Sequence, residues 1–352
     1  MRALRLLLLA LSVAALTAFT PVLPGVALQF PRDFGAHHGF KTEWWYATGW
    51  LTTADGKSVG YQVTFFRAAT GQGEQNPSRF AAKDLILAHA ALSDPAQGKL
   101  LHDQHTAREG LGLAYAEQGN TSLKLDNWRM ERDAAGRYQI DIPARDFTLR
   151  LTLAPTQPVL LQGDQGYSRK GPMPEQASYY YSEPQLRTTG AIVGPNGREQ
   201  AVTGVTWLDH EWSTQVLDPD AAGWDWIGVN LDDGGALMAF QIRSRQGSKI
   251  WSHATWRDAS GKISHYAQDQ VSFSPQTRWR SPRTNAEYPV ATMITTGDVQ
   301  WQVTPLQQDQ ELDARQSSGA VYWEGAVTVR RNGQPAGRGY LELTGYVRPM
   351  KL

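Results

Sequence analysis

A β-hairpin that occurs twice in the same form constrains the fold of this chain more than any other feature. Residues 43–51 and 59–67 are two runs rich in aromatic and β-branched residues, separated by an Asp-Gly turn. Residues 224–231 and 236–243 repeat the arrangement around a second Asp-Gly turn, and both second runs end in arginine. Aromatic and β-branched runs favour strands, and Asp-Gly favours tight hairpin turns, so each pair of runs predicts a hairpin.

Two further pairs of similar segments follow the hairpins in the same order. Residues 89–94 resemble residues 253–258. Tyr-Ser-Glu at 181–183 resembles Tyr-Trp-Glu at 322–324, and these two segments each lead to an Asn-Gly turn. One such pair is compatible with chance reuse of hairpins. Three pairs in one order indicate a duplicated β-domain with a period of roughly 150 to 180 residues, too long for a solenoid repeat.

No part of the chain shows a sustained 3.6-residue apolar period, so the sequence predicts an all-β protein. Residues 154–184 contain five prolines and are expected to form a long connection. Strand spacing alone leaves two architectures open, a pair of barrels or a pair of sandwiches.

The N-terminus has the pattern of a secretory signal peptide. Arg2 and Arg5 precede an apolar run at residues 6–18, and Gly25-Val26-Ala27 is a small-x-small cleavage site. A retained membrane anchor is the alternative. We therefore expect a signal peptide at 1–27, cleaved near Ala27, an N-terminal β-domain at 28–215 and a C-terminal β-domain at 216–352. The protein is expected to be exported, either periplasmic or secreted.

Several classes of function are excluded by composition. The chain has no cysteine, which excludes thiol catalysis, thiolate metal sites and a lipid-modified lipoprotein. Without Arg2 and Arg5, 32 basic and 34 acidic residues remain. The resulting net charge of −2 lacks the basic excess that is typical of proteins that bind nucleic acid.

No metal or cofactor is predicted. The eight histidines show no ligand spacing, and no glycine-rich nucleotide loop is present. His210-Glu211 is not the zinc-protease motif, because that motif needs a second histidine at position 214, which is threonine.

The strongest candidate for chemistry is the run at residues 207–214, where ionisable side chains stand between two tryptophans. In an extended chain Asp209 and Glu211 point to one side and His210 to the other. A carboxyl group buried beside indoles has a raised pKa and can act as a general acid. The alternative is a polar network that ties the two domains together. We predict that this run is buried between the domains, with Asp209 or Glu211 paired to an arginine, a histidine or backbone N–H groups.

A carboxylate among aromatic residues also recurs in both hairpins, as Glu43 and as Asp225. Such a group can hold or protonate a ligand, and the alternative is a strand-end charge that faces water. The candidate acids are Asp209, Glu211 and Asp225. The candidate ligand-binding residues are Glu43, Trp44, Trp45, Tyr46, Tyr181, Trp207, His210, Trp212, Trp224 and Trp226.

Several of these runs resemble the AttH and carotenoid 1,2-hydratase-like family, a lipocalin-like group. The matching stretches are Phe30-Pro31-Arg32-Asp33, Thr42-Glu43-Trp44-Trp45-Tyr46, Tyr181-Ser182-Glu183-Pro184, Trp207-Leu208-Asp209-His210-Glu211-Trp212, Gly223-Trp224-Asp225-Trp226, Ser281-Pro282-Arg283 with Tyr288-Pro289, and Tyr322-Trp323-Glu324-Gly325. The resemblance implies two tandem lipocalin-like β-barrels.

Two functions follow from the resemblance together with the residues. One is an exported protein that binds an apolar or amphipathic ligand, a lipid or a polyene, and accompanies the permease of an ABC transporter. The alternative is a hydratase or isomerase that acts on an isoprenoid or carotenoid-like alkene by acid catalysis. A mainly structural partner of a membrane protein is a third interpretation.

Overall fold

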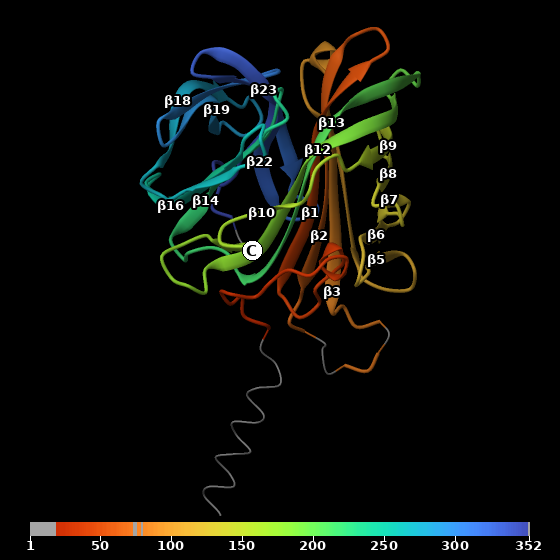
Figure 1. The fold of residues 1–352 in the computed structure, drawn as a ribbon. Helices are drawn as coiled ribbons and strands as arrows, with labels where there is room; N and C mark the ends of the chain where they lie inside the picture. Colours follow the sequence, from red (N-terminus) through yellow and green to blue (C-terminus); the bar gives the residue numbers. More distant parts are fainter. Residues whose placement is uncertain (1–18, 73–75, 79, 351–352) are drawn as a thin grey trace, which may run out of the picture.

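The computed structural model describes residues 19–72, 76–78 and 80–350, which form two large antiparallel sheets joined by a short connection (Figure 1). No helix in this part of the chain is long and apolar enough to cross a membrane. Two short 3₁₀ helices, η1 (Arg32–Phe34) and η2 (Pro95–Gln97), are the helical elements among these residues.

The first sheet has thirteen strands in the order β4-β3-β2-β1-β13-β12-β9-β8-β7-β6-β5, with β10 and β11 also paired to β12. Its strands are β1 (Thr42–Thr53), β2 (Ser58–Ala69), β3 (Asp84–Ser93), β4 (Leu101–Arg108), β5 (Ala114–Ala116), β6 (Ser122–Leu125), β7 (Trp128–Arg132), β8 (Tyr138–Pro143), β9 (Thr148–Ala154), β10 (Leu160–Leu161), β11 (Tyr167–Arg169), β12 (Ala177–Val193) and β13 (Glu199–Gln215).

The second sheet has ten strands in the order β17-β16-β15-β14-β23-β22-β20-β19-β18, with β21 paired to β22. Its strands are β14 (Ala221–Leu231), β15 (Ala236–Ser244), β16 (Lys249–Arg257), β17 (Ile263–Tyr266), β18 (Val271–Arg280), β19 (Glu287–Thr296), β20 (Val299–Pro305), β21 (Glu311–Ala314), β22 (Ala320–Arg331) and β23 (Gln334–Leu343).

The two sheets share one topology, which confirms the internal duplication. In each, the hairpin that opens the half (β1-β2 or β14-β15) pairs through its first strand with the last strand of the half (β13 or β23). That last strand then pairs with the strand before it, β12 or β22. Both predicted hairpins form in register around their Asp-Gly turns.

Each sheet curls until its two ends approach each other, which gives the lipocalin-like barrel shape. In the first half, β3 and β4 come near β5 and β6. In the second half, β15 and β16 come near β18. Period-2 alternation explains the filling of both barrels, because every second side chain of a strand points inward. Trp45, Ala47 and Leu51 of β1 lie in the first interior, and Ile227 and Val229 of β14 in the second.

The opposite faces of the same strands pack the two barrels against each other. Tyr46 and Trp50 of β1 meet Trp226 of β14 and Tyr340 of β23 in one apolar cluster between the halves. The Trp50 indole donates a hydrogen bond to the carbonyl of Gly339 across this seam, at 2.9 Å. The long strands β12 and β13, green in Figure 1, run along the seam. Apolar side chains therefore line both barrel interiors, and two cavities lie between the barrels.

The region at 154–184 differs from the long connection expected from its prolines. β10 and β11 are added to the side of β12, and β12 itself begins at Ala177. Proline is tolerated here because these segments are short and pair on one side only. The first sheet ends at Gln215 and the second begins at Ala221. The predicted domain boundary at 215/216 stays a prediction.

Candidate interdomain site

A cavity of about 270 Å³ lies in the seam between the barrels. Its walls are mostly aromatic and aliphatic, and they come from both halves. Five carboxyl residues line it: Glu43 from β1, Asp209 and Glu211 from β13, Glu324 from β22 and Glu342 from β23. Its principal apolar lining residues are Trp44, Tyr46, Phe66, Leu217, Trp224, Trp226, Phe240, Ile242 and Tyr322.

Asp209 is buried, with 3% of its surface exposed, and it accepts three hydrogen bonds. Ser182 Oγ and the Trp207 indole donate to Oδ1, and Tyr180 donates to Oδ2 at 2.7 Å. Burial raises the pKa of Asp209 to about 7, although these donors oppose the rise. A carboxyl group with this pKa is partly protonated at neutral pH. A hydrogen-bond chain links Asp209 through the Tyr180 hydroxyl to the Trp226 indole, which donates to that hydroxyl at 3.0 Å.

Glu324 and Glu342 stand opposite each other on β22 and β23, with Glu324 buried and Glu342 half-buried. Burial raises the pKa of each, and their mutual repulsion raises the pKa of Glu324 further. Two like charges directly opposite each other on a sheet are unfavourable, so the pair holds at least one proton at neutral pH. The Trp224 indole donates to Glu342 Oε2 at 3.0 Å, and Glu324 Oε1 has no hydrogen-bond partner within the described residues.

Glu211 differs from Asp209, Glu324 and Glu342 because a cation lies beside it. Lys170 Nζ is 3.0 Å from Glu211 Oε1, and both side chains are about 6% exposed. The ammonium group also lies over the rings of Tyr180 and Phe240, at 4.6 and 4.3 Å from their centroids. Such a buried pair is stable only while both partners are present.

A second polar network, centred on Glu43, closes one end of the first barrel. His37 Nδ1 and His210 Nε2 lie 2.7 and 2.8 Å from Glu43 Oε1, and Arg67 Nε donates to Oε2 at 3.1 Å. Burial would raise the pKa of Glu43, but the hydrogen bonds from His210 and His37 lower it well below its ordinary value. Burial lowers the pKa of His210 to about 4, against the opposing effect of Glu43. Glu43 is therefore a buried carboxylate.

Asp225 forms the corresponding network in the second half. Its carboxylate accepts from Arg243 Nε at 2.9 Å, from the Tyr346 hydroxyl at 2.9 Å and from the Gln241 amide at 2.7 Å. The carboxylate and the terminal arginine that recur in both hairpins are thus bonded to each other in both barrels. Neither Glu43 nor Asp225 is a strand-end charge facing water, because both are at least 98% buried.

The predicted burial of the run at 209–212 agrees with the structure, but the predicted partners do not. Asp209, His210, Glu211 and Trp212 are each 5% exposed or less. The acids pair with lysine, hydroxyl and indole donors rather than with arginine, histidine or backbone groups. The alternation of β13 turns His210 and Trp212 into the end of the first barrel, away from the second domain.

The predicted site residues fall into four places. Glu43, Trp44, Tyr46, Asp209, Glu211, Trp224 and Trp226 line the interdomain cavity. Trp207 lines a different cavity further along the seam. Trp45, Tyr181, His210 and Trp212 lie around the Glu43 network inside the first half, where His37 stacks on Trp212 at 3.8 Å. Asp225 is absent from the cavity lining, because it points into the second barrel.

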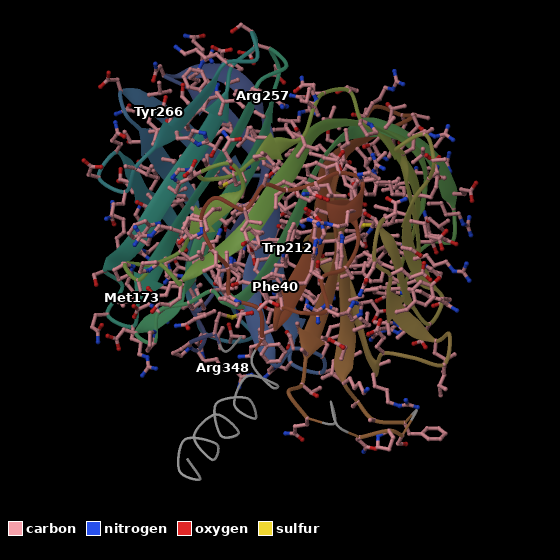
Figure 2. The ribbon with its side chains drawn as sticks, turned by 60° about the horizontal axis from the view of Figure 1, so that its bottom comes forward. Phe40, Met173, Trp212, Arg257, Tyr266 and Arg348 are labelled. Carbon is pink, nitrogen blue, oxygen red and sulfur yellow. The ribbon has the colours of Figure 1, made fainter. Side chains whose placement is uncertain are left out.

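Figure 2 shows Phe40 and Trp212 close together near the seam, in the aromatic cluster that covers this end of the first half.

Sequence reasoning missed Glu324, Glu342 and Lys170. A sequence signal did exist for Glu324, which belongs to a Tyr-x-Glu run that occurs in both halves. Its partner Glu342 belongs to no repeated run or motif. Pairing β22 with β23 is what brings the two acids together.

Two groups of histidine and carboxylate side chains also come together, which the spacing of histidines did not predict. They are His37 with Glu43 and His210, and His38 with Asp84 and Glu109. Each group has ligand atoms close enough for a metal ion. Arg67 bonds to both Glu43 and Asp84, and its guanidinium charge disfavours a cation at either place.

The fold and the cavity define a two-barrel, lipocalin-like protein, and comparison with known proteins identifies its family. The sequence model of the AttH-like family matches residues 21–346, so the chain belongs to the AttH-like family. A crystal structure of a protein assigned to AttH from Nitrosomonas europaea shares 61% sequence identity, covering 94% of this chain and 100% of that one with a TM-score of 0.89. No curated protein matches the sequence.

Two more distant structures share the fold. Kievitone hydratase from Nectria haematococca is 14% identical, with a TM-score of 0.68 over 93% of this chain and 96% of that one. CghA with Sch210972 is also 14% identical, with a TM-score of 0.51 over 86% and 89% of the two chains. At this identity the likeness establishes the lipocalin-like architecture alone.

Proposed function

We propose that the protein binds an apolar or amphipathic small molecule in the interdomain cavity. One observation carries the proposal: a cavity with aromatic walls is lined by five carboxyl residues, three of which have a raised pKa. Small-molecule sites are usually apolar cavities with a few polar groups that orient the ligand. Protonated carboxyl groups serve that purpose without placing a full charge beside an apolar ligand.

The cavity volume limits the ligand. At about 270 Å³ the space is just below the range of about 300 to 1,000 Å³ that is typical of small-molecule sites. An acyl chain or one isoprenoid end group suits this volume better than a whole carotenoid. A hydroxyl or carbonyl group on the ligand would bond to Glu324 Oε1 and to the Tyr46 hydroxyl, which have no hydrogen-bond partner in the described part of the chain.

Binding is tested with retinol and a medium-chain fatty acid as probes, by tryptophan quenching and by native mass spectrometry of gently purified protein. Leu217→Trp fills the cavity from its wall and should abolish binding. The matched control is Leu113→Trp, because Leu113 is 57% exposed and outside the lining. No bound lipid in the purified protein together with no quenching by either probe contradicts the proposal, as does equal binding by the Leu217 and Leu113 variants.

A second candidate function is acid-catalysed hydration of an alkene in the same cavity. It is favoured by the raised pKa of Glu324 and of Glu342, which stand opposite each other, and by Asp209 with a pKa of about 7. A carboxyl group donates its proton to one alkene carbon, water adds to the other carbon, and the proton that water loses returns to the carboxylate. The Trp226 face would stabilise the developing carbocation.

Hydration is measured as the gain of one water by a short isoprenoid alkene. Glu324→Gln and Glu342→Gln should lower turnover at least about a hundredfold each if they supply the proton. Asp141→Asn is the control, because Asp141 is 58% exposed and outside the cavity lining. Absence of turnover in the native protein removes hydration but leaves ligand binding as proposed above.

We also propose that the protein is exported and accompanies the permease of an ABC transporter. The signal-peptide pattern of the N-terminal sequence supports the proposal of export. Residues 1–18 of that pattern lie outside the described residues. Residues 19–27 pack on the first barrel: Thr20 N donates to the carbonyl of Gly39, and Val22 is 4% exposed. The expected cleavage near Ala27 would remove these contacts, and it stays a prediction.

N-terminal sequencing of protein from the periplasmic fraction checks the cleavage position. Recovery of the chain in the cytoplasmic fraction, with residues 1–18 intact, would contradict export. A pulldown from envelope membranes that recovers no permease subunit would contradict the transporter association.

A further inference from the structure

A second cavity, of about 390 Å³, lies further along the same seam. It is formed by other residues of the strands that line the first cavity, such as Thr48 and Trp50 of β1, Asn230 of β14 and Arg338 of β23. The edge-to-face pair of Trp207 and Trp226, with ring centroids 6.3 Å apart, stands between the two cavities. The two spaces are therefore separate sites in one interface.

The walls of this second cavity are polar, unlike those of the first. Threonine, asparagine, glutamine and backbone groups of several glycines face it, and the apolar surface is supplied mainly by Trp50 and Trp207. Gly228 is required for this arrangement, since a Cβ there would lie 2.6 Å from the Trp226 ring and 3.0 Å from the Trp207 ring.

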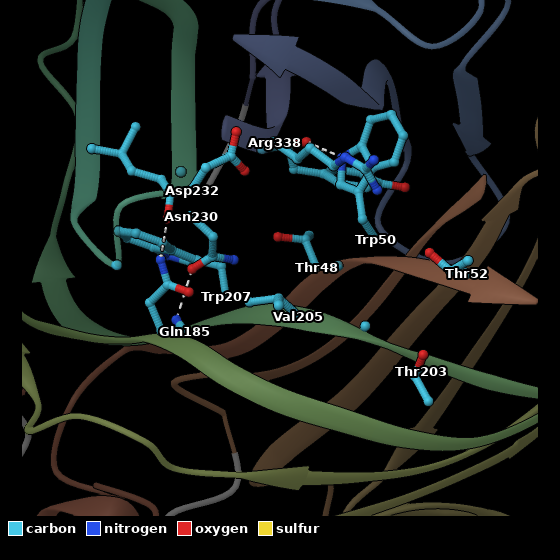
Figure 3. A pocket seen from close by; sticks show the side chains of 17 residues that line it. Thr48, Trp50, Thr52, Gln185, Thr203, Val205, Trp207, Asn230, Asp232 and Arg338 are labelled. Carbon is cyan, nitrogen blue, oxygen red and sulfur yellow. Dashed lines mark hydrogen bonds between the residues drawn. The ribbon is translucent and has the colours of Figure 1, made fainter. Parts of the chain in front are cut away.

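Two buried hydroxyl groups in the lining have no hydrogen-bond partner within the described residues: Thr48 Oγ1 and the Tyr340 hydroxyl. Each residue is only 1% exposed. Figure 3 shows the Thr48 hydroxyl directed into the space below Asp232 and Asn230. A buried polar group without a partner costs about 1 to 3 kcal/mol, so two of them in one cavity indicate that a ligand supplies the missing partners.

The charges around the cavity balance. Asp232 and Arg338 both lie at exposed positions of its rim, and the Arg338 guanidinium lies 5.0 Å from the centre of the Trp50 ring. One acid and one base of opposite sign give no net attraction for an anion or a cation. The side-chain amide of Gln185 is not free to bond a ligand, because it donates hydrogen bonds to the carbonyls of Leu231 and Gly235 and fixes the loop beside the cavity.

We infer that this second cavity binds a neutral hydroxylated compound of the sugar or polyol class. Its hydroxyl groups would bond to Thr48 and Tyr340 and to the rim side chains, while its C–H face packs on the Trp50 and Trp207 indoles, which combine a large apolar surface with polar edges. The compound is either a free sugar or the sugar headgroup of a glycolipid.

Binding is tested on the full-length protein with glucose and myo-inositol as free probes and octyl glucoside, below its micelle concentration, as the glycolipid probe. Saturation-transfer NMR detects the contact, and tryptophan fluorescence gives the affinity. We expect saturable binding of at least one neutral probe. Preference for octyl glucoside identifies a headgroup as the source of the sugar, and equal or better binding of glucose or myo-inositol identifies a free compound.

Thr48→Val and Tyr340→Phe remove the two unpaired hydroxyls with little change of shape. Each should weaken binding about tenfold, equivalent to about 1.4 kcal/mol. Neither should lower the melting temperature, because neither hydroxyl has a partner to lose. Quenching by retinol in the first cavity should be unchanged, which separates this site from the function proposed above.

Three results overturn the inference: no binding of any of the three probes, unchanged affinity in both variants, or binding of glucose 6-phosphate or gluconate in preference to glucose. If either variant is unfolded, Thr52→Val at the half-buried rim of the same cavity replaces it and carries the same expectation of weaker binding.

Discussion

Replacing Asp209 by Asn should remove a large part of the pH dependence of stability. Asn has the same shape and can still accept from Ser182 and Trp207 through Oδ1, while its amide faces the Tyr180 hydroxyl, which would then have to accept. The native carboxyl group has a pKa of about 7, against an ordinary value of 3.8, because it is buried.

The sign follows from proton binding. Between pH 3.8 and about 7 the folded protein holds a proton on Asp209 that the unfolded chain has released, so stability falls as pH rises through this window. The whole difference between the two pKa values, about 3, corresponds to about 4 kcal/mol, and the part between pH 5 and pH 8 to about 3 kcal/mol. The variant should gain about this much relative to the native protein as pH rises from 5 to 8.

Urea unfolding at pH 5 and pH 8, followed by tryptophan fluorescence, measures the difference. Glu324 and Glu342 titrate in both proteins, so their contribution largely cancels. Asp141→Asn, at a 58% exposed position, is the matched control and should show no such trend. A free-energy difference between the native protein and the Asp209→Asn variant that is constant within about 0.5 kcal/mol would refute the reasoning, because Asp209 would then have an ordinary pKa.

Three other substitutions test the packing of the seam and of the barrel end. Glu43→Gln leaves the fully buried Arg67 without its full counter-charge, and unfolding by urea at pH 7 should show a loss of about 3 to 5 kcal/mol. Gly228→Ala forces a methyl group against two indoles, so calorimetry should show a lower melting temperature, equivalent to about 1 to 3 kcal/mol. Glu211→Gln should cost about 1 to 3 kcal/mol by removing the ion pair with Lys170, and Lys170→Met in the same chain should restore part of this loss. No change of stability in any one of these variants would contradict the role given to that residue.

The fold was predictable from local signals. Aromatic strands, Asp-Gly turns and the order of the repeated segments are enough to predict two similar β-domains, because hairpins depend on residues that are close in sequence. The family resemblance then selected barrels over sandwiches. The proline-rich region at 154–184 was misjudged because β10 and β11 depend on pairing with β12, which the local composition does not encode.

The site was predictable only in part. Alternation along one strand correctly separated Asp209 and Glu211 from His210, since neighbouring side chains of a strand point to opposite faces. Asp225 was grouped with the other acids because it also stands between tryptophans, although the same alternation puts it on the opposite face of the strand from Trp224 and Trp226. Glu342 has no local signal at all, and only the register between β22 and β23 places it opposite Glu324.

The position of the cavity outside both barrels has a consequence for the origin of the molecule. The first half contributes Asp209 and Glu211, and the second contributes Glu324 and Glu342. A single ancestral copy of this barrel would have carried one wall of such a cavity on its outer surface, with its aromatic residues open to water. It could have enclosed a ligand only by pairing with a second copy of itself. Gene fusion would then have freed the two walls to diverge. Glu211 and Glu342 still occupy equivalent positions, opposite Trp44 and Trp226, whereas the residue on their other side is Tyr180 in the first half and Glu324 in the second.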